Sequence, residues 1–243
     1  MTVHRTGFAI IFTILTVSAT LESSAQSVDE IIAKSLAARG GAEKVKSVNS
    51  ERLTGRISVG PGVEGPFIVE IKRGGKMREG MLLSGKTIIR ATNGTTGWMK
   101  IDDDAPSALS PGDLKNMAGG ADLDGALMDY KAKGNRVEYS GKEKLDGKDT
   151  YKLKVTLKNG EVREEYIDCV SNLGLKWVGK IINQEKEVAV ESLFSDYRAV
   201  DGVMFAFRID SQTVGSSNQQ TITLDKIEVN PSLDDARFEQ PAN

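Results

Sequence analysis

The sequence predicts a mainly β fold with a helical cover: one large, strongly curved antiparallel sheet or barrel of about eleven or twelve strands. Apolar and polar residues alternate in short segments between residues 50 and 229, as in strands with one buried face. Short turns rich in Gly, Asn and Asp separate these segments, and such turns join antiparallel neighbours. Helical spacing occurs instead before the first strand and in one insertion. A meander of this many strands has to curve.

The first 25 residues have the pattern of a secretory signal peptide. A short basic start (1–5) is followed by an apolar run (7–21), and the small residues Ser23 and Ala25 fit the two positions that a signal peptidase reads. The alternative is a retained membrane anchor, for which the run is short. We therefore expect cleavage after Ala25 and a soluble periplasmic protein whose residues 26–243 form a single domain.

Two helices are expected at the start of this domain. Ser27 and Glu30 form a capping box, apolar residues at helical spacing follow, and Gly40-Gly41 ends the helix. A second short helix is expected over about residues 42–47. The simplest interpretation is a pair of helices that cover the core.

The strands are clearest in "TYKLKVTLK" (150–158), where Tyr151, Leu153, Val155 and Leu157 share one face. In "TITLDKIEV" (221–229) the apolar parity changes, so a β-bulge is expected near Asp225-Lys226. Strands are predicted near 51–59, 66–73, 76–83, 86–92, 97–101, 136–142, 149–158, 162–168, 174–183, 187–198, 203–213 and 220–229.

An insertion at about residues 106–132 interrupts the strands. Ser110 is a good N-cap, and Pro111 suits the first helical position. We expect two short helices, joined through Gly119-Gly120, that form a mobile lid. Its apolar side chains are Leu114, Met117, Leu123, Leu127, Met128 and Tyr130.

Composition excludes several classes of function. The one histidine is His4, inside the predicted leader, so histidine-based triads and zinc sites with imidazole ligands are excluded from the mature chain. A net charge of −2 argues against nucleic-acid binding. Asp102–Asp104 lacks the pattern of a calcium loop, and the glycines have turn spacing rather than phosphate-loop spacing. We expect no metal, no cofactor and no catalytic residues.

Two residues stand out against this background. Arg73 shares strand parity with Val69 and Ile71, so it either reaches to water at a strand end or faces a cavity and binds a covering helix. Trp98 follows the turn at Asn93-Gly94, where it belongs either to the core or to the wall of a pocket.

The motifs around these residues resemble the LolA/LolB superfamily of lipoprotein-sorting proteins. In that family a strand with Lys-Arg-Pro leads to a hairpin and a later strand with Asp-Gly-x-x-x-Trp. Here the corresponding stretches are "VEIKRGGKMREG" (69–80), with Gly74 in place of the proline, and "ATNGTTGWMKI" (91–101). The resemblance implies an unclosed antiparallel half-barrel with a helical lid over an apolar cavity. It also implies that Arg73 controls the lid and that Val69, Ile71 and Trp98 line the lipid cavity.

The same resemblance implies a non-enzymatic carrier. Its cargo would be acylated lipoproteins or lipids, carried as a monomer from an inner-membrane donor complex to an outer-membrane acceptor. Two alternatives stay open: a sensor of envelope stress or lipid on the same scaffold, and a carboxylate-based enzyme, although the sequence brings no two carboxylates together.

Overall fold

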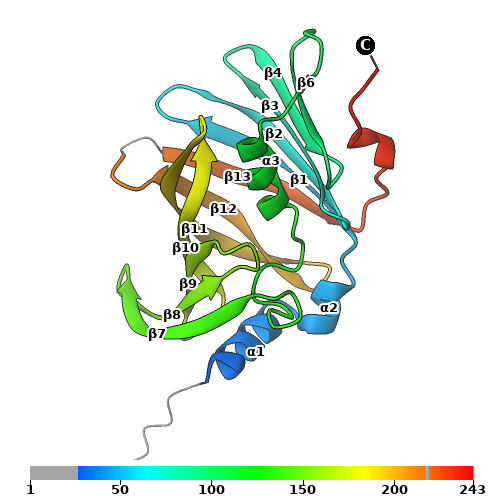
Figure 1. The fold of residues 1–243 in the computed structure, drawn as a ribbon. Coiled ribbons are helices and arrows are strands. Elements are labelled where there is room, and N and C mark those ends of the chain that lie inside the picture. Colours follow the sequence, from blue (N-terminus) through cyan, green and yellow to red (C-terminus); the bar gives the residue numbers. More distant parts are fainter. Residues whose placement is uncertain (1–26, 217–218, 243) are drawn as a thin grey trace, which may run out of the picture.

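A computed structural model describes residues 27–216 and 219–242, so the predicted leader lies outside the described residues. Within these ranges, thirteen strands form one antiparallel sheet in the order β6-β5-β4-β3-β2-β1-β13-β12-β11-β10-β9-β8-β7 (Figure 1). The sheet is not closed, because β6 and β7 are its two edges. The prediction of a half-barrel with a helical cover is confirmed.

The strands lie close to their predicted positions. The thirteenth, unpredicted strand is β6 (Ser107–Ala108), which is too short to show alternation and pairs with Trp98 and Met99. The other bounds are β1 (Ser50–Val59), β2 (Glu64–Lys72), β3 (Lys76–Leu83), β4 (Lys86–Thr92), β5 (Gly97–Ile101), β7 (Arg136–Leu145), β8 (Lys148–Thr156), β9 (Val162–Asp168), β10 (Gly174–Asn183), β11 (Lys186–Val200), β12 (Val203–Thr213) and β13 (Gln219–Val229).

The first and last strands meet in the middle of the sheet. Thr54 of β1 pairs with Lys226 of β13, and Gly55 pairs with Leu224, so Asp225 is the extra residue of a bulge. The predicted bulge is confirmed. A Cβ at Gly55 would lie 2.1 Å from the carbonyl oxygen of Thr223, so the close approach of the strands at the bulge requires glycine.

The two N-terminal helices also follow the prediction. α1 (Val28–Ala38) begins with the Ser27–Glu30 capping box, and α2 (Ala42–Lys46) follows two glycines with positive φ. Ile31 and Ile32 of α1 are buried in a cluster with Leu153 and Val155 of β8. α1 therefore covers one end of the sheet.

The insertion differs from the prediction. Its first helix, α3 (Pro111–Gly120), begins at the Ser110 cap as predicted, but the prediction of a second helix is wrong. Gly119 and Gly120 end α3 instead of joining two helices, and residues 121–135, here called the turn segment, form successive turns. Positive φ values at Gly125 (76°) and Asp129 (49°) interrupt any helix there.

α3 defines an inner and an outer face of the sheet, because it lies across the curve and contacts β3, β4 and β10 (Figure 1). The inner face carries the main apolar core, where strand residues meet buried side chains of α2, α3 and the turn segment. Its buried members include Val45, Val48, Phe67, Val69, Ile71, Met77, Met117, Leu123 and Met128.

The outer face near β2 is covered by the C-terminal segment, residues 230–242, which includes η1 (Asp235–Arg237). Fully buried Glu70 accepts hydrogen bonds from Arg52 (2.9 Å) and Arg237 (2.8 Å), and Arg78 lies 3.9 Å away. Burial acts to raise the pKa of Glu70, but the hydrogen bonds from Arg237 and Arg52 hold it below its ordinary value. This buried charge fastens the C-terminal segment to the sheet.

Glu70→Ala should lower the free energy of unfolding by about 3 kcal/mol, because it removes the charge-assisted hydrogen bonds from Arg52 and Arg237 and leaves these partly exposed side chains without a partner. Glu64→Ala on the same strand is the control, since its pair with Arg56 is exposed and is worth at most about 1 kcal/mol. Urea denaturation of both variants measures the difference. Equal decreases in the free energy of unfolding of the two variants would contradict a special role of Glu70.

Candidate functional site

The candidate site is the inner face beneath α3 and the turn segment, together called the cover. Val69 and Ile71 lie on this face, 7% and 8% exposed, in one cluster with Met117, Leu123 and Met128 of the cover. The remaining side chains predicted for the lid are partly buried: Leu114 lies near Gly97 of β5, and Leu127 and Tyr130 pack against the cluster that contains α1. In the structure the cover therefore shields the inner face from water.

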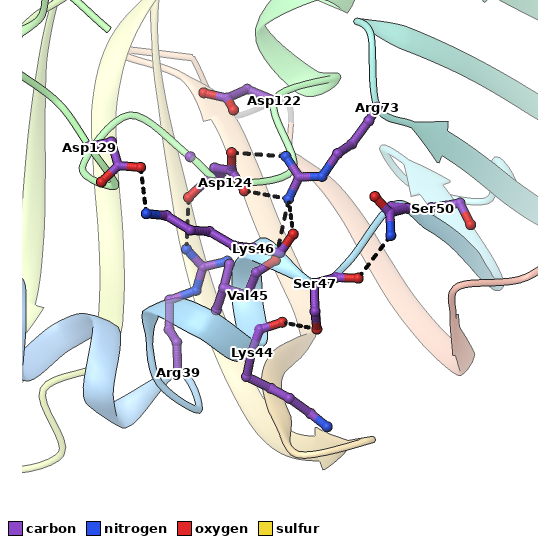
Figure 2. Close-up of polar contacts among 12 residues, drawn as sticks. Arg39, Lys44, Val45, Lys46, Ser47, Ser50, Arg73, Asp122, Asp124 and Asp129 are labelled. Atoms are coloured by element: carbon purple, nitrogen blue, oxygen red, sulfur yellow. Dashed lines mark hydrogen bonds and ion pairs between the residues drawn. The ribbon is translucent and has the colours of Figure 1, made fainter. Parts of the chain in front are cut away.

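Arg73, the residue that follows β2, joins three parts of this site (Figure 2). Its two terminal nitrogens donate to the two carboxylate oxygens of Asp124 in the turn segment, at 2.9 and 2.8 Å. One of them also donates to the carbonyl oxygens of Lys46 (2.9 Å) and Val45 (3.4 Å) in α2. Arg39 donates to the backbone carbonyl of Asp124 at 3.2 Å. We call the Arg73–Asp124 pair the clasp.

The clasp agrees with the expectation that Arg73 binds the cover. Its acceptor in the cover is the carboxylate of Asp124, and its carbonyl acceptors belong to α2. Sequence reasoning missed Asp124 and Arg39. The Asp124-Gly125 dipeptide is a turn signal that places a short carboxylate on a loop. Control of closure by Arg73 stays a prediction.

Other ion pairs hold the turn segment more weakly. Lys46 lies 2.8 Å from Asp129 (Figure 2), and Lys131 lies 2.8 Å from Asp29 of α1. Lys133 lies 2.7 Å from Asp122 within the segment itself. Surface pairs of this kind are worth at most about 1 kcal/mol each, so the bidentate clasp is the strongest polar contact of the cover.

Glu51 of β1 is a buried carboxyl group next to this site, on the inner face and paired with Ile71. Burial raises its pKa to about 7, although the positive charges of Arg39 and Arg73 act in the opposite direction. Glu51 therefore changes its charge near neutral pH beside the clasp. No local sequence pattern marks Glu51 as special, because its burial depends on the cover.

The prediction that Trp98 lines the same cavity as Val69 and Ile71 is wrong. Trp98 pairs with Ala91, which pairs with Arg78, which pairs with Glu70, and directly paired residues share a face. Trp98 therefore lies on the outer face. Its indole N–H donates to the carbonyl oxygen of Phe238 at 3.1 Å, and the side chain is 6% exposed beneath the C-terminal segment.

Trp177, which the sequence analysis did not name, is the tryptophan of the inner face. It pairs with Glu165 of β9, which pairs with the inner-face residue Leu153. It lines a cavity of about 640 Å³ between α3, β9 and β10, a size typical of ligand pockets. The lining is Lys115, Asn116, Gly119, Gly120, Leu157, Asn159, Gly160, Glu161, Val162, Arg163, Trp177, Gly179, Lys180, Ile181, Ile182 and Glu187.

No protein-family model and no curated protein sequence matches the chain. Solved structures do match it. A DUF1329 family protein from Desulfovibrio piger has a TM-score of 0.59 at 14% identity, over 87% of this chain and 97% of that protein. A LolA superfamily protein from Nitrosomonas europaea has a TM-score of 0.54 at 15% identity, over 87% and 96%. The chain has a LolA-like fold.

A third structure with this fold is a putative outer membrane lipoprotein-sorting protein domain from Vibrio parahaemolyticus, with a TM-score of 0.54, 12% identity and coverage of 86% and 94%. These identities are low, so the similarity establishes the fold. No helix within the described part of the chain is long and apolar enough to cross a bilayer.

Asp124→Asn should loosen the cover. The hydrogen bonds from Arg73 hold the pKa of Asp124 below its ordinary value, so the clasp is intact at neutral pH and is lost as the pH falls through that lowered pKa. Amide exchange in α3 and the turn segment should accelerate about tenfold in the variant near neutral pH, while β8 is unchanged. The difference in amide exchange rate between the wild type and Asp124→Asn should disappear in acid. Asp129→Asn, at an exposed pair, is the control, and equal exchange in all three proteins would contradict the clasp.

Glu51→Gln should change how stability depends on pH. The pKa of Glu51 is about 7 in the folded protein, above its ordinary value of 4.5, so ionisation destabilises the wild type as the pH rises between these values. The wild type should lose about 3 kcal/mol relative to Glu51→Gln between about pH 4 and pH 8, measured by urea denaturation. Glu64→Gln, at an exposed site, should follow the wild type. Parallel curves for wild type and Glu51→Gln would show that Glu51 ionises freely.

Proposed function

We propose that this protein binds acyl chains of lipids or lipoproteins on its inner face, beneath the cover. One observation carries the proposal: the apolar strand residues of the inner face are covered by side chains of helices and of the turn segment rather than by a second sheet. Met117, Leu123 and Met128 are among these covering side chains, and Met128 is only 1% exposed. Methionine adapts easily to different apolar partners, so acyl chains are suitable replacements.

The energetics of transfer favour such a site. At about 0.8 kcal/mol per CH₂, an acyl chain of about 16 carbons gains on the order of 12 kcal/mol when it leaves water. Lifting the cover costs the clasp and the apolar contacts of α3, and an acyl chain restores the apolar contacts. A few kcal/mol between the closed and open states then suffice for binding and release.

For the biological role we propose a non-enzymatic periplasmic carrier. The LolA-like fold that this protein shares with a putative outer membrane lipoprotein-sorting domain supports that role. In this proposal residues 26–243 form one exported, monomeric domain, freed of its leader after Ala25. The carrier receives acylated lipoproteins or lipids from an inner-membrane complex and delivers them to an outer-membrane acceptor.

Titration with a fluorescent fatty acid, with unlabelled palmitate as competitor, tests the proposal. Arg73→Leu removes the clasp and should raise the affinity for the fatty acid several-fold, because less free energy is spent on opening. Arg56→Leu is the matched control, since it removes a cation of an exposed pair on β1. Absence of binding, or binding that palmitate does not displace, would refute the proposed function.

A further inference from the structure

The sheet divides between β9 and β10. β9 pairs with β10 only as far as Val178, whereas β10 continues to Asn183 in register with β11. Val162 and Arg163 of β9 stay paired with β8. Beyond Val178, the side of β10 that faces β9 pairs with no strand among the described residues. Gly179 still lies against β9, since a Cβ there would be 3.2 Å from the Cβ of Arg163, and α3 lies beside the rest of this edge (Figure 1).

Asn116 of α3 occupies part of this strand edge. Its side-chain nitrogen donates to the carbonyl oxygen of Ile182 at 2.7 Å, and its side-chain oxygen accepts from the backbone N–H of Ile182 at 3.0 Å. A residue of an antiparallel strand exchanges the same two bonds with its partner. The carboxamide of Asn116 therefore makes the two hydrogen bonds that one residue of a neighbouring strand would make.

The next position along the edge is Lys180. The N–H and C=O of a strand residue point to one side, and this side alternates along the strand, so the backbone groups of Lys180 face the same way as those of Ile182. Lys180 has no pairing partner in the described part of β9. The edge thus offers a second pair of backbone groups in line with the one that Asn116 occupies.

The cavity of about 640 Å³ runs along this edge, and its chemistry suits a peptide. Trp177 and Ile181 give it apolar walls. The cations of the rim already have carboxylate partners: Lys115 lies 2.5 Å from Glu161, and Lys180 lies 2.9 Å from Glu187. Arg163 is likewise paired, at 2.6 Å from Glu165. A free anion would have to compete with these pairs, whereas a peptide backbone does not.

We propose that the edge of β10 at residues 180–183 binds an extended polypeptide segment as an added strand, with Asn116 giving way when α3 lifts. Addition of a strand to an exposed edge is a general mode of peptide recognition. The inference rests on the proposed function and deepens it. The segment is the chain that follows the acylated terminus of a lipoprotein, held in the cavity while the acyl chains lie on the inner face.

Palmitoylated peptides test this proposal against palmitate alone. The peptide has about eight alternating Thr and Val residues, the length of a strand, and two further versions carry N-methyl groups on one or the other alternate set of amides. The peptide should bind about tenfold more tightly than palmitate, and one N-methylated version alone should lose this gain, because one set of amides faces β10. Hydrogen exchange should show new protection of the Lys180 and Ile182 amides.

Two variants locate the effect. Asn116→Ala removes the carboxamide and should bind the palmitoylated peptide several-fold more tightly than the wild type. Lys34→Ala removes an exposed cation of α1 that does not line the cavity, so it should bind like the wild type.

The inference is overturned if palmitate binds as tightly as its peptide conjugate, or if both N-methylated versions lose affinity equally. Protection of Lys180 and Ile182 by palmitate alone would assign the cavity to an acyl chain. Self-association of Asn116→Ala without peptide would assign the edge to a second copy of the protein. If no palmitoylated probe binds at all, the proposed function fails, while an unacylated peptide that protects this edge would still support the inference.

Discussion

The apolar inner face of an unclosed sheet has to be kept from water, and most of this structure follows from that constraint. In a closed barrel the strands surround their own core, but in this open sheet the strands alone would leave the core exposed to water. α1, α2, α3 and the turn segment pack on the inner face and cover this core. Because α3 and the turn segment add no strand to the sheet, polar contacts from their side chains fix their position. The Arg73–Asp124 clasp and the Asn116 carboxamide are the two main contacts of this kind.

The two faces of β2 use opposite chemistry. On the inner face Val69 and Ile71 make only apolar contacts with the cover, which can be exchanged for other apolar contacts. On the outer face buried Glu70 pairs with Arg52 and Arg237, and removal of the carboxylate or of the arginines leaves an unpaired charge. The outer face and the C-terminal segment are therefore the rigid support, and the inner face is the side where rearrangement costs least.

Sequence reasoning succeeded where the signal is local. Alternation in 150–158, the capping box at Ser27 and the parity change at Asp225 each depend on a few neighbouring residues, and each gave the observed element. It failed where the outcome depends on contacts between distant segments. Trp98 follows the expected turn, but its face is decided by the register of four strands and by the cover of Phe238, 140 residues away. The partner of Arg73 likewise comes from a segment 51 residues along the chain.

The pairing of β1 with β13 has a consequence for how the chain folds. Each half of the sheet, β1 to β6 and β7 to β13, is a meander of hairpins that form from nearby residues, whereas the β1–β13 seam joins residues such as Ser58 and Thr221. Closing so long a loop is entropically costly, and such contacts slow folding. The halves can then form first and the seam last. Until it forms, the only link between them within the described chain is the stretch from β6 to β7 that contains the cover, so a cut there would turn one folding reaction into the assembly of two fragments.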